Sequence, residues 1–101
     1  MKELLRELCL IDGVSGDESA VREYIIGKIK DVCEYRIDPL GNLICFRKGR
    51  KTPAKKLMIC AHMDEVGFIV TAIKSDGTLA FGEVGGVDPA VAIGRQVRVG
   101  K

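Results

Sequence analysis

The stretch of sequence that decides the fold reads Leu57-Met58-Ile59-Cys60-Ala61-His62-Met63-Asp64-Glu65-Val66-Gly67. An apolar run with the character of a β-strand ends at His62, the only histidine of the chain, and two carboxylates follow almost at once. Apolar strands that stop at a polar tip are how α/β proteins present reactive groups at the edge of a sheet. Because residues two apart in an extended chain share a face, we expect the side chains of His62 and Asp64 to point to the same side.

The pairing of His62 with Asp64 suggests half of a metal site. A metal-bound imidazole usually donates its second N–H to a carboxylate, which fixes the tautomer and raises the basicity of the ligand. Cys60 shares the strand face with His62 and is a candidate soft ligand, although packing in the core is the favoured interpretation of this thiol. The pattern gives Glu65 no role beyond the structural alternative of a salt bridge in a loop. A lone histidine at a strand end is more often structural, so the residues alone leave metal binding open.

Composition excludes several classes of protein. The chain has 101 residues, with 16 Lys and Arg against 14 Asp and Glu, and this balance does not argue for nucleic acid or a membrane surface as a partner. The basic run from Arg47 to Lys56 is interpreted as a solvated loop, with an anionic partner site as the alternative. No apolar run approaches the roughly 20 residues of a membrane span, and the N-terminus is not that of a signal peptide.

The cysteines argue against a structural zinc site. Such sites normally bring their thiolates in closely spaced pairs, and no two cysteines of this chain lie close in sequence. Apolar neighbours flank each of them, which predicts buried free thiols in a reducing compartment. The four positions are Cys9, Cys33, Cys45 and Cys60.

The first half of the chain is typical of an α/β protein. Ser15-Gly16-Asp17-Glu18 has the form of a capping box, so we expect a helix to begin there and to run to about Val32. The run from Lys56 to Ala61 is apolar on both faces, which predicts a central strand covered on both sides. The other elements predicted here are a helix over 3–11, a strand over 34–38, a turn over 39–42 and a strand over 43–48.

The character of the sequence changes after Glu65. Consecutive strands then follow one another, which predicts two domains meeting near Asp64, over residues 1–65 and 66–101. The glycine-rich stretch 84–89 lacks the context of a phosphate-binding motif and is interpreted as a tight structural loop. The predicted elements are strands over 66–74 and 79–83 joined by a hairpin turn at 75–78, one helical turn over 89–93, and a strand over 95–99.

Several segments in register resemble the N-terminal part of the M42 family of metallo-aminopeptidases. The combination of Gly-Val-Ser-Gly with Ala-His-Met-Asp-Glu-Val-Gly is specific, and the resemblance spans nearly the whole chain. The matching stretches are 4–8, 13–18, 38–43, 61–67 and 84–88.

The resemblance implies a fold and a function. The fold is the N-terminal part of a metallopeptidase-type α/β catalytic domain (1–65), followed by the start of an inserted β-rich domain that assembles homo-oligomers (66–101). The function is that of a cytoplasmic aminopeptidase that removes N-terminal residues from short peptides with two divalent metal ions, zinc or cobalt. His62 matches a metal ligand, and Asp64 matches the catalytic-site carboxylate that holds this imidazole.

Family members are considerably longer than this chain. Their remaining parts hold the bridging Asp, the general-base Glu, the other acidic ligands and the final His, none of which has a counterpart here. A catalytic zinc site needs about three protein ligands, so we expect the chain to bind metal only partially and to be inactive alone. The alternative is a truncated, non-catalytic assembly or binding module that uses its β-rich half.

Overall fold

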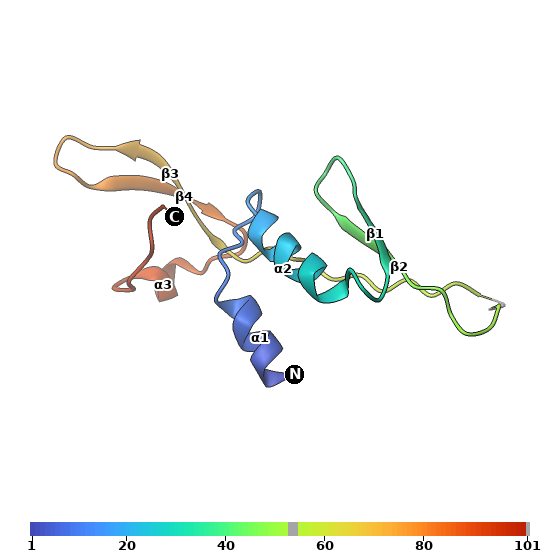
Figure 1. The fold of residues 1–101 in the computed structure, drawn as a ribbon. Helices are drawn as coiled ribbons and strands as arrows, with labels where there is room; N and C mark the ends of the chain where they lie inside the picture. The colour runs from blue at the N-terminus through green and yellow to red at the C-terminus, as the bar shows by residue number, and fades with distance from the viewer. Residues whose placement is uncertain (53–54, 101) are drawn as a thin grey trace.

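The computed structural model describes residues 1–52 and 55–100. Within these residues, three helices and two separate β-hairpins follow one another along an elongated molecule (Figure 1). Its extents are 64 × 31 × 23 Å and its radius of gyration is 18.1 Å, whereas a compact chain of this length has a radius of about 13 Å. The apolar side chains that are buried among the described residues are Val21 and Ile26. The described residues therefore form a small mixed α/β segment without a closed sheet or a large core.

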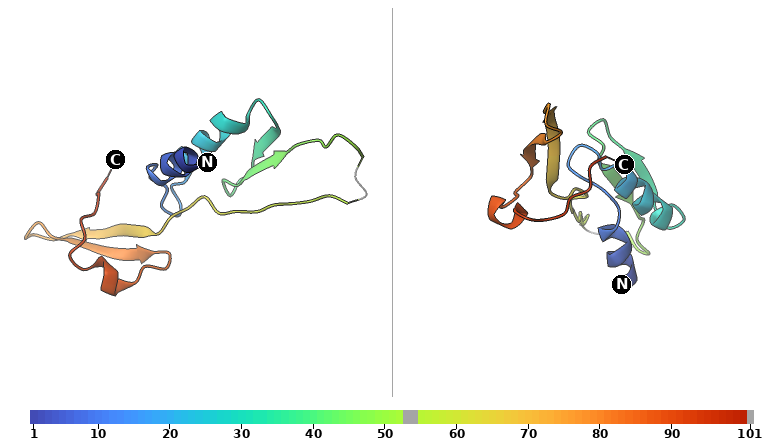
Figure 2. Two further views of the ribbon diagram at one scale, coloured as in Figure 1. Left: turned by 90° about the horizontal axis from the view of Figure 1, so that it is seen from below. Right: turned by 90° about the vertical axis from the view of Figure 1, so that its left-hand side faces the viewer.

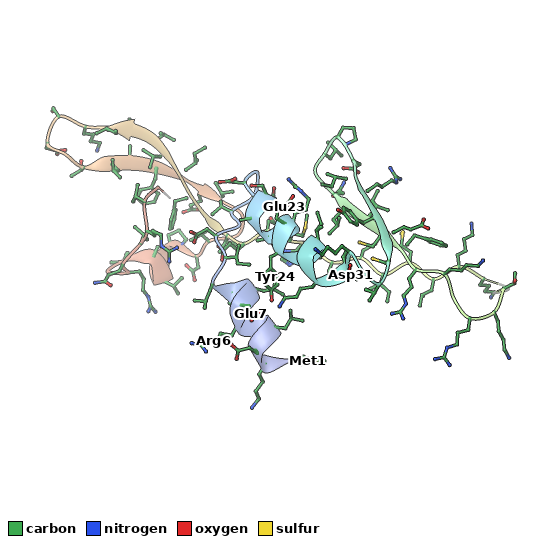
Figure 3. The ribbon with its side chains drawn as sticks, viewed as in Figure 1. Met1, Arg6, Glu7, Glu23, Tyr24 and Asp31 are labelled. Atoms are coloured by element: carbon green, nitrogen blue, oxygen red, sulfur yellow. The ribbon has the colours of Figure 1, made fainter. Side chains whose placement is uncertain are left out.

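The two N-terminal helices form as predicted and are joined by a polar contact. Helix α1 spans Lys2–Cys9 and helix α2 spans Ser19–Ile29. The carboxylate of Glu7 on α1 accepts a hydrogen bond from the Tyr24 hydroxyl on α2 (Figure 3). It also accepts from Lys28 Nζ on α2 at 3.0 Å. The predicted extension of α2 to Val32 is wrong, because a turn closed by hydrogen bonds to the Ile29 carbonyl follows the helix.

The predicted capping box at the start of α2 is also wrong. The N-cap is Glu18, and it makes no side-chain cap hydrogen bond. Its Oε1 instead accepts from the Gly16 amide at 2.7 Å, inside the preceding loop. The Ser15 hydroxyl is used elsewhere, in a contact with Asp64.

The first hairpin pairs β1 (Glu34–Ile37) with β2 (Leu43–Phe46) in an antiparallel register. Its turn is built around Asp38, whose Oδ1 accepts from the amides of Leu40 and Asn42 at 3.0 and 2.9 Å. The Asn42 side-chain amide, which donates to Oδ2 at 2.9 Å, is the main cause that holds the pKa of Asp38 below its usual range, and the two backbone hydrogen bonds add to it. The turn predicted at 39–42 is thus confirmed, and Asp38 is the residue that closes it.

The predicted central strand at Lys56–Ala61 does not form. This segment runs extended between the two hairpins without a strand partner among the described residues (Figure 2). Leu57, Met58 and Ile59 are 88%, 83% and 86% exposed. A strand that is apolar on both faces needs neighbouring strands and covering helices, and neither described hairpin supplies them.

The second hairpin agrees with the sequence pattern. Strands β3 (Gly67–Ile73) and β4 (Leu79–Val84) pair antiparallel, and the Phe68 and Phe81 rings meet edge to face with centroids 4.7 Å apart. The single helical turn α3 (Pro89–Ala92) follows, capped by the Asp88 side chain. The strand predicted at 95–99 does not form among the described residues.

The basic run forms a loop as the sequence predicts, whereas the cysteines differ from the prediction. Residues 47–52 and 55–56 are exposed loop, as predicted, whereas Pro53 and Ala54 lie outside the described residues. The four cysteines are free, but the predicted burial is wrong: Cys33 is half-buried, and Cys9, Cys45 and Cys60 are exposed, since the described residues bury few apolar side chains. No helix in the described part of the chain is long and apolar enough to cross a membrane.

Candidate metal-ligand site

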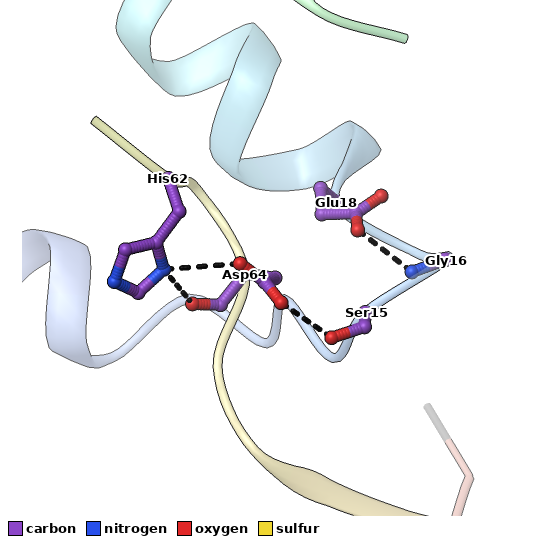
Figure 4. A network of polar contacts seen from close by, with 5 residues as sticks. All are labelled: Ser15, Gly16, Glu18, His62 and Asp64. Carbon is purple, nitrogen blue, oxygen red and sulfur yellow. Dashed lines mark hydrogen bonds and ion pairs between the residues drawn. The ribbon is translucent and has the colours of Figure 1, made fainter. Parts of the chain in front are cut away.

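The site lies where the extended segment turns into β3, and His62 and Asp64 meet there. The Nδ1 atom of His62 lies 2.9 Å from the backbone carbonyl oxygen of Asp64 and 3.0 Å from its Oδ1 (Figure 4). Both oxygens are acceptors, so Nδ1 carries the ring proton and Nε2 keeps a lone pair. The His62 side chain is 85% exposed. The imidazole therefore has the tautomer and the accessibility of a metal ligand that binds through Nε2.

The second carboxylate oxygen of Asp64 is engaged by the loop before α2. The Ser15 hydroxyl donates to Oδ2 of Asp64 (Figure 4). This hydrogen bond, and next the one from His62, hold the pKa of Asp64 below its usual range. Asp64 therefore stays ionised and acts as an acceptor on both sides. Sequence reasoning missed Ser15 because its motif also fits a helix cap.

Glu65 fixes the same loop from its other end. Its backbone amide donates to the Gly13 carbonyl at 2.8 Å, and its Oε1 accepts from the Gly13 amide at 3.2 Å. Val14 and Glu65 form a parallel bridge at this point. A Cβ on Gly13 would lie 2.6 Å from Val21 Cγ2, so only glycine allows the approach. The contact that the structure gives Glu65 is thus with a backbone amide, rather than the salt bridge weighed from the sequence.

A cavity of about 220 Å³ opens beside His62. The β1–β2 turn forms its opposite wall, and Arg22 on α2 supports this wall by donating to the Gly41 carbonyl at 3.1 Å. Glu18 and Asn42 contribute polar groups to the cavity. From the sequence, Glu18 was assigned only to a helix cap and Asn42 only to a turn. The lining residues are Glu18, Leu40, Gly41, Asn42, Leu43, Ala61, His62, Met63 and Asp64.

The side chains at this site can supply one metal ligand, the imidazole of His62. No group of three or more His, Cys, Asp or Glu side chains within residues 1–52 and 55–100 is placed to hold a metal ion. Cys60 is exposed and joins no such group. His62 is available as a single ligand, and a complete centre needs donors from beyond the described residues.

Comparisons with known proteins give one consistent result. The family model for M42 glutamyl aminopeptidase matches residues 41–101. The chain is 40% identical over 98 residues to the lysyl aminopeptidase of Pyrococcus furiosus, covering 95% of this chain and 28% of that protein.

Two solved structures resemble the chain in both sequence and fold. A Thermotoga maritima endoglucanase structure superposes with a TM-score of 0.77 and 51% identity, over 86% of this chain and 28% of that one. A Pyrococcus horikoshii TET1 peptidase, which can assemble into a tetrahedron or a large octahedral shell, gives a TM-score of 0.74 and 41% identity, over 86% of this chain and 26% of that one. The chain thus spans little more than a quarter of these relatives. It belongs to the M42 glutamyl aminopeptidase family.

Proposed function

We propose that the chain is the N-terminal part of a two-metal aminopeptidase that removes N-terminal residues from short peptides. The observation that carries this proposal is the state of His62, whose Nδ1 faces two oxygens of Asp64 while the side chain is 85% exposed. In this proposal His62 is a metal ligand and Asp64 holds its imidazole. Zinc and cobalt are the proposed metals, since both accept imidazole ligands. When bound, they would polarise the scissile carbonyl and activate water near neutral pH.

The division into domains belongs to the same proposal. Residues 1–65 would be part of the catalytic α/β domain, and residues 66–101 would open an inserted β-rich domain. The separation of the β1–β2 hairpin from the β3–β4 hairpin supports this division, because no strand pairing within residues 1–52 and 55–100 joins them (Figure 1). The assembly described for the Pyrococcus horikoshii relative supports a homo-oligomeric parent protein.

Loss of the His62 side chain tests the proposed function. The full-length parent, loaded with Zn²⁺ or Co²⁺, should hydrolyse amino-acid anilides, and His62→Ala should abolish this activity while oligomer size is unchanged. Ser75→Ala, at the far turn of the β3–β4 hairpin, is a control that should keep full activity. A His62→Ala parent that turns over substrate at the wild-type rate would refute the proposal.

A second candidate is a non-catalytic assembly module. The exposure of large apolar side chains on β3 and β4, among them Ile69, Ile73 and Phe81, favours it. The coding sequence after Lys101 distinguishes the two: a frame that continues with Asp, Glu and His motifs supports the enzyme, and a stop codon supports the module.

A further inference from the structure

We infer that Ser15 is a positioning residue whose hydroxyl orients the Asp64 carboxylate so that Oδ1 strengthens the Nδ1–H tautomer of His62, which the main-chain carbonyl of Asp64 also supports. The geometric part of this inference stands on the contacts alone. Its consequence for metal binding rests on the proposed function of His62.

The two oxygens of the Asp64 carboxylate have separate partners. His62 Nδ1–H donates to Oδ1 over 3.0 Å, and the Ser15 hydroxyl donates to Oδ2. The terminal torsion of an aspartate side chain is broad and roughly two-fold, so one partner alone leaves the carboxylate free to turn. A second donor on the opposite oxygen removes this freedom. Ser15 thereby keeps Oδ1 aimed at the imidazole.

The loop that carries Ser15 is itself anchored next to Asp64. Glu65, the residue after Asp64, makes reciprocal hydrogen bonds with Gly13, and Val14 bridges to Glu65. The close approach of Gly13 to Val21 seats this loop against α2. The hydroxyl is therefore delivered from a backbone fixed on both sides, as groups supporting a metal ligand generally are.

Glu18, which lines the same cavity as Asp64, does not replace Ser15. Oε1 of Glu18 is occupied by the Gly16 amide within the same loop (Figure 4). A carboxylate accepts hydrogen bonds and does not supply a donor to a second carboxylate. Among the described residues, Ser15 therefore supplies the hydroxyl that donates to Oδ2 of Asp64.

The single histidine of the chain makes the inference directly measurable. Nitrogen-15 NMR of the imidazole at alkaline pH, where the ring is neutral, reports the ratio of the Nδ1–H to the Nε2–H tautomer in the metal-free 101-residue chain. Ser15→Ala should lower this ratio about fivefold, the size expected for the net effect of one hydrogen bond. Ser15→Thr keeps a hydroxyl and should keep the wild-type ratio. Ser19→Ala, a nearby serine whose hydroxyl faces Asp17 instead, should also leave it unchanged.

Amide spectra of the β3–β4 hairpin show whether each variant retains the fold. A folded Ser15→Ala chain with the wild-type tautomer ratio would overturn the inference, and so would loss of the ratio in a folded Ser15→Thr chain. In the metal-loaded parent, Ser15→Ala should weaken Zn²⁺ affinity about tenfold while Ser15→Thr restores it. If His62→Ala leaves the parent fully active, the proposed function fails. The tautomer ratio in the metal-free chain tests the role of Ser15 independently of that result.

Discussion

Asp64 offers the Nδ1 atom of His62 two oxygens of different kinds. One is the backbone carbonyl at 2.9 Å, and the other is the carboxylate Oδ1 at 3.0 Å. Side-chain substitution removes the second oxygen but cannot remove the first. The tautomer of His62 thus has a main-chain support that survives changes at Asp64.

We predict that Asp64→Asn in the metal-loaded parent retains much of the metal binding and loses most of the rate. The backbone carbonyl still accepts from Nδ1, but the negative charge that raises the basicity of the imidazole is gone. Changes at such supporting groups cost roughly 10–100-fold. Metal titration and anilide hydrolysis of the same preparation measure the two effects separately.

The matched control for Asp64→Asn is Asp76→Asn. Asp76 also carries a hydrogen-bonded carboxylate, which accepts from the Thr78 amide and hydroxyl at 2.9 and 2.7 Å in the β3–β4 turn. This variant makes the same charge change far from His62 and should keep wild-type turnover. Wild-type metal affinity and turnover in Asp64→Asn would show that the role given to Asp64 is wrong.

We predict that the 101-residue chain alone has no aminopeptidase activity with any divalent metal. Its described residues bring no group of three metal donors together, whereas a catalytic zinc site needs about three. The measurement is anilide hydrolysis by the purified chain with Zn²⁺, Co²⁺ or Mn²⁺. Turnover above that of a His62→Ala chain would contradict the prediction.

We predict that the chain associates with copies of itself. Leu57, Met58 and Ile59 are exposed on an extended segment that pairs with no strand among the described residues, and such edges recruit other chains. Sedimentation across a dilution series should show concentration-dependent mass, and Met58→Lys should shift the equilibrium toward monomer. A compact monomer that melts cooperatively at every concentration would contradict it.

We predict that acid separates α1 from α2. Hydrogen bonds from Tyr24 and then Lys28 hold the pKa of Glu7 below its ordinary value of 4.5. A carboxylate with a lowered pKa in the folded state stabilises that state above its unfolded pKa, and this contribution is lost as the pH falls through the folded pKa. Amide shifts of α1 should change over that acidic range in the wild type.

Two substitutions test whether Glu7 is the group that responds to acid. Glu7→Gln should remove the acid-dependent change in the α1 shifts. Glu3→Gln, on the same helix and beside Arg6, should leave it in place. An unchanged acid response in Glu7→Gln would assign the transition to another group.

Local patterns predicted the local elements. The β3–β4 hairpin formed because alternating residues flank a turn whose Asp76 and Gly77 supply the side-chain acceptor and the positive φ of 84°. The strand predicted at Lys56–Ala61 failed for the opposite reason. Its apolar pattern is that of a strand that lies between two neighbouring strands. Those neighbours must come from distant segments, which the pattern of this segment does not specify.

The candidate site was predictable only in part. The spacing of His62 and Asp64 was enough to put both on one face, and their contact in the structure agrees. The participation of Ser15 depends on a contact across 49 residues, which no local pattern contains. Ser15, which the pattern assigned to a capping box, makes this distant contact instead.

The extended run before His62 also bears on proteolysis. Peptidases bind their substrates as extended strands, and the backbone from Leu57 to Ile59 already has this form, with exposed side chains. Cleavage there needs no local unfolding, in contrast to a bond within α2 or β3. The first cut made by a digestive enzyme would therefore divide His62 and β3 from the first hairpin.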